Sequence, residues 1–146
     1  MTKYEELKNL QEKEINNLPL HFAFGNKQLE EKANELGFKN VEELTKNVTG
    51  IGAGGFVLNK DFNKVMETFK RQAEEIQKLI DLDDEFLESA FEYELGNHEY
   101  IITYDITDTL RALSISYQEF SNSERMQKIM EKAKNKYLEA MKNLGW

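Results

Sequence analysis

Residues 61–80 read DFNKVMETFKRQAEEIQKLI, and this stretch decides the fold class. Its apolar residues recur at intervals that place their side chains on one face of an α-helix. They are Phe62, Val65, Met66, Phe69, Ala73, Ile76, Leu79 and Ile80. We therefore predict an amphipathic helix of about five turns, the longest organising element of a largely helical body.

The segment that follows, residues 81–108, contains ten carboxylates and no Lys or Arg. The whole chain has 146 residues and a net charge of −8, from 19 basic and 27 acidic side chains, so the remainder is slightly positive. Asp83 and Asp84 suit a helix start, where acidic side chains interact favourably with the helix dipole. Glu88 and Glu92 lie beyond that first turn. The negative charge is therefore concentrated in one segment. The electric field of such a segment attracts basic surfaces of other molecules.

The last predicted helix runs from about Ser123 to Leu144 and has a basic outer face. Its lysines are Lys128, Lys132, Lys134, Lys136 and Lys142. We expect this helix to pack beside the acidic one, so that each partly neutralises the other. Between them, Asn97–Tyr104 has the aromatic and β-branched content of a third strand or of a stiff connection. Ser116 with Glu119 has the spacing of a capping box.

The N-terminal half mixes helical and strand patterns. Residues 4–18 form a polar helix, and residues 20–24 alternate large apolar with smaller or polar side chains, as in a strand. Asn26 can cap a second helix, and Asn40 opens a third with capping-box spacing. Residues 56–58 form a short strand after a glycine-rich loop. The chain is thus predicted to be α+β, mostly helical with about five to seven helices, and with a small two- or three-stranded sheet.

Composition favours a single compact domain over residues 1–146. Apolar residues make up 40 % and aromatic residues 11 % of the chain, with one Pro and no Cys. Without Cys, disulfides and thiolate metal sites are excluded. No stretch approaches the ~20 apolar residues of a membrane span, and the N-terminus has no signal-peptide pattern. The chain also lacks the polybasic cluster that binding to nucleic acid or anionic lipid requires. We expect a cytoplasmic protein with no cofactor, no metal, no membrane association and no direct nucleic-acid binding.

The acidic segment has a structural and a functional interpretation. Charge runs are usually solvated helix faces and ordinary caps. However, Glu85, Glu88 and Glu92 share one helix face, and no Lys relieves their mutual repulsion. Large single-sign fields are usually for steering a partner. The predicted partner-binding residues are Asp84, Glu85, Glu88, Glu92, Glu94 and Glu99, with Tyr93 and Tyr100 as aromatic contacts.

The glycine-rich stretch Gly50–Gly55 suggests an alternative, a small-ligand or nucleotide-signal binder. Its candidate ligand residues are Gly52, Gly54 and Gly55, with His98 orienting the ligand. The spacing matches GxGxxG formally, but a strand follows where a helix should open. A tight turn or a close approach of two backbones explains the glycines equally well.

The two histidines carry little catalytic signal. His98 lies four residues after Glu94 and could share a helix face with it, which leaves an enzyme using His98 with Glu94 or Glu99 as the weakest alternative. No metal-ligand pattern and no nucleophile motif accompany the pair. We therefore predict no enzymatic activity.

Four short motifs give the chain a family resemblance. They are Leu18-Pro19, Phe22-Ala23-Phe24, the Gly50–Gly55 loop with Phe56, and Glu94-Leu95 before Asn97-His98-Glu99-Tyr100. In these the chain resembles small uncharacterised proteins of phages, prophages and other mobile elements of low-GC bacteria. The resemblance covers most of the chain and implies a counter-defence setting, but no reaction and no catalytic residue.

Together these observations predict an acidic binding protein that inhibits a host nucleic-acid-handling defence complex. Its carboxylate-rich surface would act as a nucleic-acid mimic, in the manner of an anti-CRISPR protein, and occupy the basic groove of a host nuclease or other defence protein. The apolar helix stripes would serve a homodimer equally well.

Overall fold

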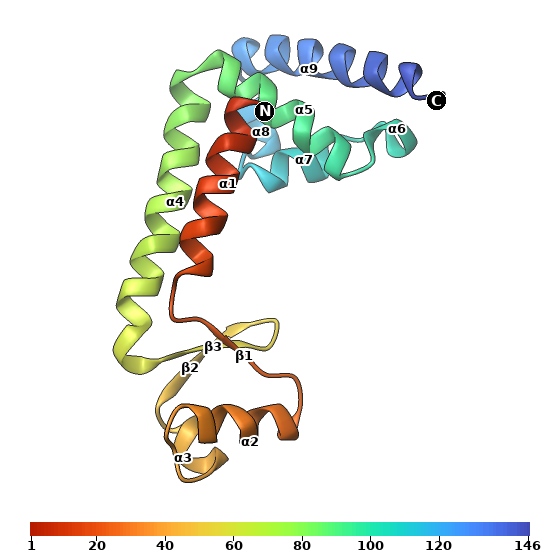
Figure 1. Cartoon of the computed structure of the whole chain (residues 1–146). Coiled ribbons are helices and arrows are strands. Elements are labelled where there is room, and N and C mark those ends of the chain that lie inside the picture. The colour runs from red at the N-terminus through yellow and green to blue at the C-terminus, as the bar shows by residue number, and fades with distance from the viewer. The chain divides into compact units, whose positions relative to one another are not determined.

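A computed structural model describes residues 1–146 and shows a mostly helical α+β fold with a three-stranded antiparallel sheet (Figure 1). This confirms the predicted fold class. The helices number nine rather than five to seven. Several of them have only one or two turns, too few for an apolar repeat to be detected in the sequence.

In chain order the elements are α1 (Lys3–Asn16), β1 (His21–Phe22), α2 (Asn26–Glu35), α3 (Val41–Thr45), β2 (Val48–Gly52), β3 (Gly55–Leu58), a 3₁₀-helix (Asn59–Asp61), α4 (Phe62–Leu82), α5 (Asp84–Asn97), α6 (Tyr100–Thr103), α7 (Thr107–Ala112), α8 (Tyr117–Ser121) and α9 (Glu124–Asn143). No helix is both long enough and apolar enough to cross a membrane.

The chain divides into two compact units. Met1–Gln11 and Gln72–Trp146 form one, which we call the helical unit, and Glu12–Arg71 form the other, the sheet unit. The prediction of a single domain over residues 1–146 stays a prediction. The two units are described separately below.

The helical unit is built around α5, which packs along α9 (Figure 1). Phe86, Phe91 and Leu95 of α5 and Met130 of α9 are fully or almost fully buried in its core. Because these apolar side chains fall at helical spacing, one side of each helix lies in the core and the other carries the charges. The core thereby fixes which acidic side chains reach the surface.

Side-chain caps start several helices where the sequence predicted them. Asp83 accepts a hydrogen bond from the Phe86 amide at 3.0 Å, and Ser116 accepts one from the Glu119 amide at 3.0 Å. Asn40 and Ser123 do the same at the starts of α3 and α9. Such caps pair amides that the helix itself leaves without a partner. Asn26 is not a cap, because α2 begins at that residue after Gly25.

The sheet unit has strand order β1-β3-β2. The glycine-rich stretch is therefore not a loop before a strand but the hairpin of β2 and β3, with Gly52 opposite Gly55. Ala53 and Gly54 connect the strands with φ of 50° and 77°. Two positive φ values in a two-residue connection define the mirror-image turn that hairpins favour.

Of the two alternatives predicted for residues 97–104, a strand or a stiff connection, the strand is wrong. This stretch contains the four-residue helix α6, flanked by Glu99 and Tyr104, which both have positive φ. Tyr100 is 6 % exposed, and its ring meets Tyr137 edge-on with centroids 6.1 Å apart. Packing of one aromatic side chain on α9 thus overrides the local β propensity.

Candidate functional site

A groove on the helical unit is the best candidate for a functional site. The start of α1 lies beside α5, where the Tyr4 amide donates a hydrogen bond to the Ser89 hydroxyl at 3.2 Å (Figure 1). Two hollows of about 280 and 200 Å³ adjoin here, since Thr2, Ser89 and Glu92 line both. We call the two together the α1–α5–α9 groove.

One end of this groove is mostly apolar. Besides the shared residues and Glu5, it is lined by Tyr93, Gly96, Tyr137, Ala140 and Met141. Tyr93 is 40 % exposed, so its ring is available for contact from solvent. No Lys or Arg lines this end.

The other end is charged. Besides the shared residues and Met1, it is lined by Lys3, Glu6, Glu85, Glu88 and Lys136. Three carboxylates converge there from α1 and α5, and the shared Glu92 adds a fourth. This end of the groove is therefore net negative even with both lysines in place.

Lys3 and Lys136 neutralise part of that charge. Lys3 lies 3.0 Å from Asp83 and 3.1 Å from Glu85, and these carboxylates raise the pKa of the Lys3 ammonium. The Phe86 amide and Lys3 together lower the pKa of Asp83. Lys136 donates a hydrogen bond to Glu88 at 2.9 Å, which raises the pKa of Lys136. The expected pairing between the acidic helix and the basic last helix is thus present.

Three of the carboxylates in the groove have no such partner. Glu5, Glu6 and Glu92 form no ion pair in the structure. No cation is in contact with them, so they are the carboxylates most open to a cationic side chain of another molecule.

Asp84 lies at a different position. Arg125 of α9 donates a hydrogen bond to its carboxylate at 2.6 Å and another to the Ile80 carbonyl at 2.8 Å. The guanidinium ties the end of α4 to the starts of α5 and α9. Asp84 is 72 % exposed at its side chain, but this partner engages it in a structural contact.

Glu94 is buried rather than outward-facing, which corrects its assignment to a docking surface. Only 2 % of it is exposed. Its carboxylate accepts hydrogen bonds from the Tyr4 hydroxyl at 2.6 Å and from the side-chain amide of Asn97 at 3.2 Å. Lys8 lies 3.6 Å away, with its ammonium over the Tyr4 ring. This cluster fastens α1 onto α5.

His98 lies at the edge of the same cluster. Its Nε2 is 3.2 Å from a Glu94 oxygen but makes no hydrogen bond. Burial, followed by the bond to Glu94, raises the pKa of the Tyr4 hydroxyl above its usual range, so this group stays protonated as a donor. Neither end of the groove is lined by Tyr4, Glu94 or His98, so this cluster suits a structural junction.

The predicted partner-binding residues are therefore only partly brought together. Glu85, Glu88, Glu92 and Tyr93 line one groove. Glu99 is exposed at the start of α6, and Tyr100 is buried, so a docking role for Tyr100 is wrong as well. Sequence reasoning missed the contribution of α1, above all Thr2, Lys3 and Glu6, and did not include Lys136 of α9 in the site. A repeating charge pattern within one helix carries no signal for residues that reach it from elsewhere in the chain.

The residues of the alternative ligand site do not form a cradle. Gly54 and Gly55 lie close to Phe24 and Phe22, since a Cβ on Gly54 would clash with the Phe24 ring. The Gly54 carbonyl accepts a hydrogen bond from the Ala23 amide at 3.0 Å. The glycines thus allow β1 and the hairpin to approach each other closely. His98, the fourth residue predicted for this ligand site, belongs to the helical unit, whereas the glycines belong to the sheet unit.

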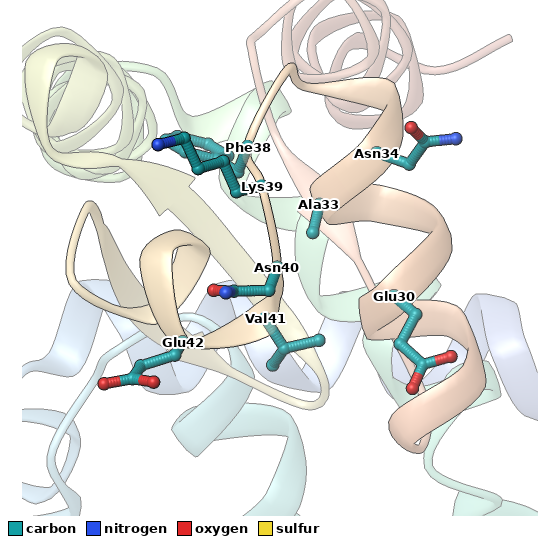
Figure 2. Close-up of a pocket in the computed structure, with 8 residues that line it drawn as sticks. All are labelled: Glu30, Ala33, Asn34, Phe38, Lys39, Asn40, Val41 and Glu42. Atoms are coloured by element: carbon teal, nitrogen blue, oxygen red, sulfur yellow. The ribbon is translucent and has the colours of Figure 1, made fainter.

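A hollow of about 520 Å³ lies in the sheet unit, at the turn between α2 and α3 (Figure 2). Ala33, Phe38 and Val41 are among its lining residues. Figure 2 shows Lys39 and Asn34 extending in opposite directions, so the polar groups around it diverge. A small-molecule site needs a few polar groups that converge on the ligand. This hollow does not provide them.

The best candidate site is thus a groove with one apolar and one acidic end. A family model matches residues 3–136, and the chain belongs to that family, described as "Family of unknown function (DUF7659)". A search of curated proteins and a search of solved structures found no match. The family description names no partner and no reaction, so the phage setting inferred from short motifs stays a prediction.

Proposed function

We propose that this chain is a binding protein that inhibits a nucleic-acid-handling defence complex of a bacterial host. The α1–α5–α9 groove is the contact surface, and its carboxylates take the place of nucleic-acid phosphates in a basic cleft of the partner. The observation that carries the proposal is the convergence of Glu6, Glu85, Glu88 and Glu92 around one hollow.

The ion pairs already present modify this mechanism. Exposed ion pairs contribute little to stability, because solvent screens them and both side chains lose freedom. Lys3 is 46 % and Lys136 is 59 % exposed at the side chain, so both can swing into solvent. A partner's arginines can therefore replace them on Glu85 and Glu88, with bidentate geometry that a lysine cannot match.

This proposal assigns no catalytic role. Glu94 belongs to the cluster that joins α1 to α5, and His98 lies 3.2 Å from it. We interpret this contact as structural rather than catalytic. The proposed choice of partner follows from the charge of the groove. A net negative surface repels nucleic acid itself and selects proteins that bind it.

The test uses affinity capture from a bacterial lysate, followed by competition with duplex DNA. We expect the captured proteins to be nucleic-acid-binding proteins that DNA displaces from the immobilised chain. The triple variant Glu85→Lys, Glu88→Lys and Glu92→Lys should capture none of them.

The matched control carries the same change of charge in the sheet unit, at the exposed residues Glu30, Glu31 and Glu35 of α2. It should capture the same proteins as the unmodified chain. Captured proteins that DNA fails to displace, and that both variants retain equally, would refute the proposal.

A further inference from the structure

The apolar end of the α1–α5–α9 groove contains a glycine that the fold itself does not require. Gly96 lies in α5 with helical backbone, where glycine is less favourable than alanine. A Cβ at this position would meet Tyr137 at 3.6 Å, an ordinary contact. Neither the backbone conformation nor the packing of α5 on α9 therefore excludes a side chain here.

A bare stretch of helix backbone in a groove allows another chain to approach closely. The walls around Gly96 suit an apolar side chain. Tyr93 offers an exposed ring, and Tyr137 and Ala140 form the opposite side from α9. Met141 adds a flexible thioether side chain, of the kind that adapts to differently shaped partners. Tyrosine is also among the residues that contribute most at protein interfaces.

The charges around the hollow restrict which chain can occupy it. Glu5 and Glu92 line it, and no basic side chain does. Glu92 also lines the charged end, where Glu6, Glu85 and Glu88 follow. An apolar group bound beside Gly96 would thus have carboxylates next to it in one direction along the groove.

We propose that the groove binds a basic peptide segment of a partner protein through one apolar anchor. A leucine-sized or aromatic side chain enters the hollow at Gly96, and a neighbouring Lys or Arg pairs with Glu92 and the charged end. The anchor rests on the proposed function, because it uses the same groove. It adds a requirement that pure phosphate mimicry does not have, since a nucleic-acid cleft offers charge but need not offer an apolar side chain.

The experiment measures binding of two synthetic peptides by NMR on the isotope-labelled full chain. One peptide is acetyl-Gly-Lys-Leu-Lys-Gly-amide, and the other has Ser in place of Leu. We expect the Leu peptide to bind about tenfold more tightly, the effect of one well-buried apolar group. It should shift the amide signals of Tyr93, Gly96 and Met141, whereas the Ser peptide should shift only those of the charged end.

Two variants fill the hollow from opposite walls, Gly96→Leu from α5 and Ala140→Phe from α9. Each should abolish the preference for the Leu peptide, so that the two peptides bind with equal affinity. The control is Ala112→Leu, which adds an apolar side chain at an exposed position of α7 and should keep the preference. Using two variants guards against the misfolding of either.

The outcomes separate the two proposals. Equal affinities of the two peptides for the unmodified chain would overturn the apolar anchor and leave the acidic surface standing. A preference that survives in both filled variants would overturn it too. If neither peptide shifts the signals of Glu85 and Glu88, the acidic groove fails as a docking surface, and the anchor fails with it.

Discussion

Replacing Tyr4 by Phe should destabilise the helical unit far more than the loss of a single oxygen suggests. The Tyr4 hydroxyl donates to the Glu94 carboxylate at 2.6 Å, and Glu94 is 2 % exposed. The phenylalanine keeps the ring packing against Phe86, with centroids 5.7 Å apart. What changes is that a buried carboxylate loses its shortest hydrogen bond.

The magnitude follows from that chemistry. A hydrogen bond to a charged group contributes about 1.5–3 kcal/mol, and removing one partner leaves the other to bear the cost of burial. We therefore expect Tyr4→Phe to lower the free energy of unfolding by about 2 kcal/mol. In a Glu94→Gln background the bond joins two neutral groups, and the same change should cost only about 1 kcal/mol.

Urea unfolding followed by far-ultraviolet circular dichroism measures these values, with all four variants forming a double-mutant cycle. Tyr93→Phe is the control, because Tyr93 is 40 % exposed and its hydroxyl makes no hydrogen bond in the structure; the change should stay within about 0.5 kcal/mol. A cost for Tyr4→Phe that is equally small, or that is the same with Glu and with Gln at position 94, would show that the buried carboxylate does not depend on Tyr4.

Three further predictions concern other elements. Burial and the Lys32 ammonium lower the pKa of His21 below its usual 6.5, so protonation favours the unfolded chain. Thermal stability should therefore fall as the pH is lowered from about 7 through 6.5, and His21→Gln should flatten that fall in a pH series of melting curves. Ala53→Asn gives the hairpin turn the sequence Asn-Gly, which this turn type favours, and calorimetry should show a stabilisation of about 1 kcal/mol. Ser123→Ala removes the cap of α9, and urea unfolding should show a loss of about 1 kcal/mol.

The elements that the sequence predicts well are those governed by neighbours in the chain. The apolar spacing of residues 61–80 predicts α4, and Ser116 and Ser123 cap the helices that follow them. These signals depend on residues three or four positions apart, so one sequence suffices to detect them. The conformation of Asn97–Tyr104 depends instead on where Tyr100 packs, so neighbouring residues alone do not predict it.

The site was harder to predict than the fold, since its contacts join distant parts of the chain. Tyr4 and Glu94 are separated by 90 residues, and Lys3 and Asp83 by 80. Periodicity within α5 shows that Glu85, Glu88 and Glu92 share a face. It does not show that the start of α1 closes a groove over that face and brings a lysine with it.

The internal lysines change what a salt titration of partner binding would measure. When a partner's arginine replaces Lys136 on Glu88, one ion pair is exchanged for another, and salt screens both. Only the groove carboxylates without an internal partner, Glu5, Glu6 and Glu92, would form ion pairs on binding that were absent before. The dependence of affinity on salt should therefore correspond to about three new ion pairs rather than to the full set of acidic residues in 81–108. Lys3 and Lys136 limit the number of new ion pairs, so removing these lysines should both strengthen binding and steepen its dependence on salt. If the carboxylates had no internal partners, removing the lysines would free no further carboxylate and would not have this double effect.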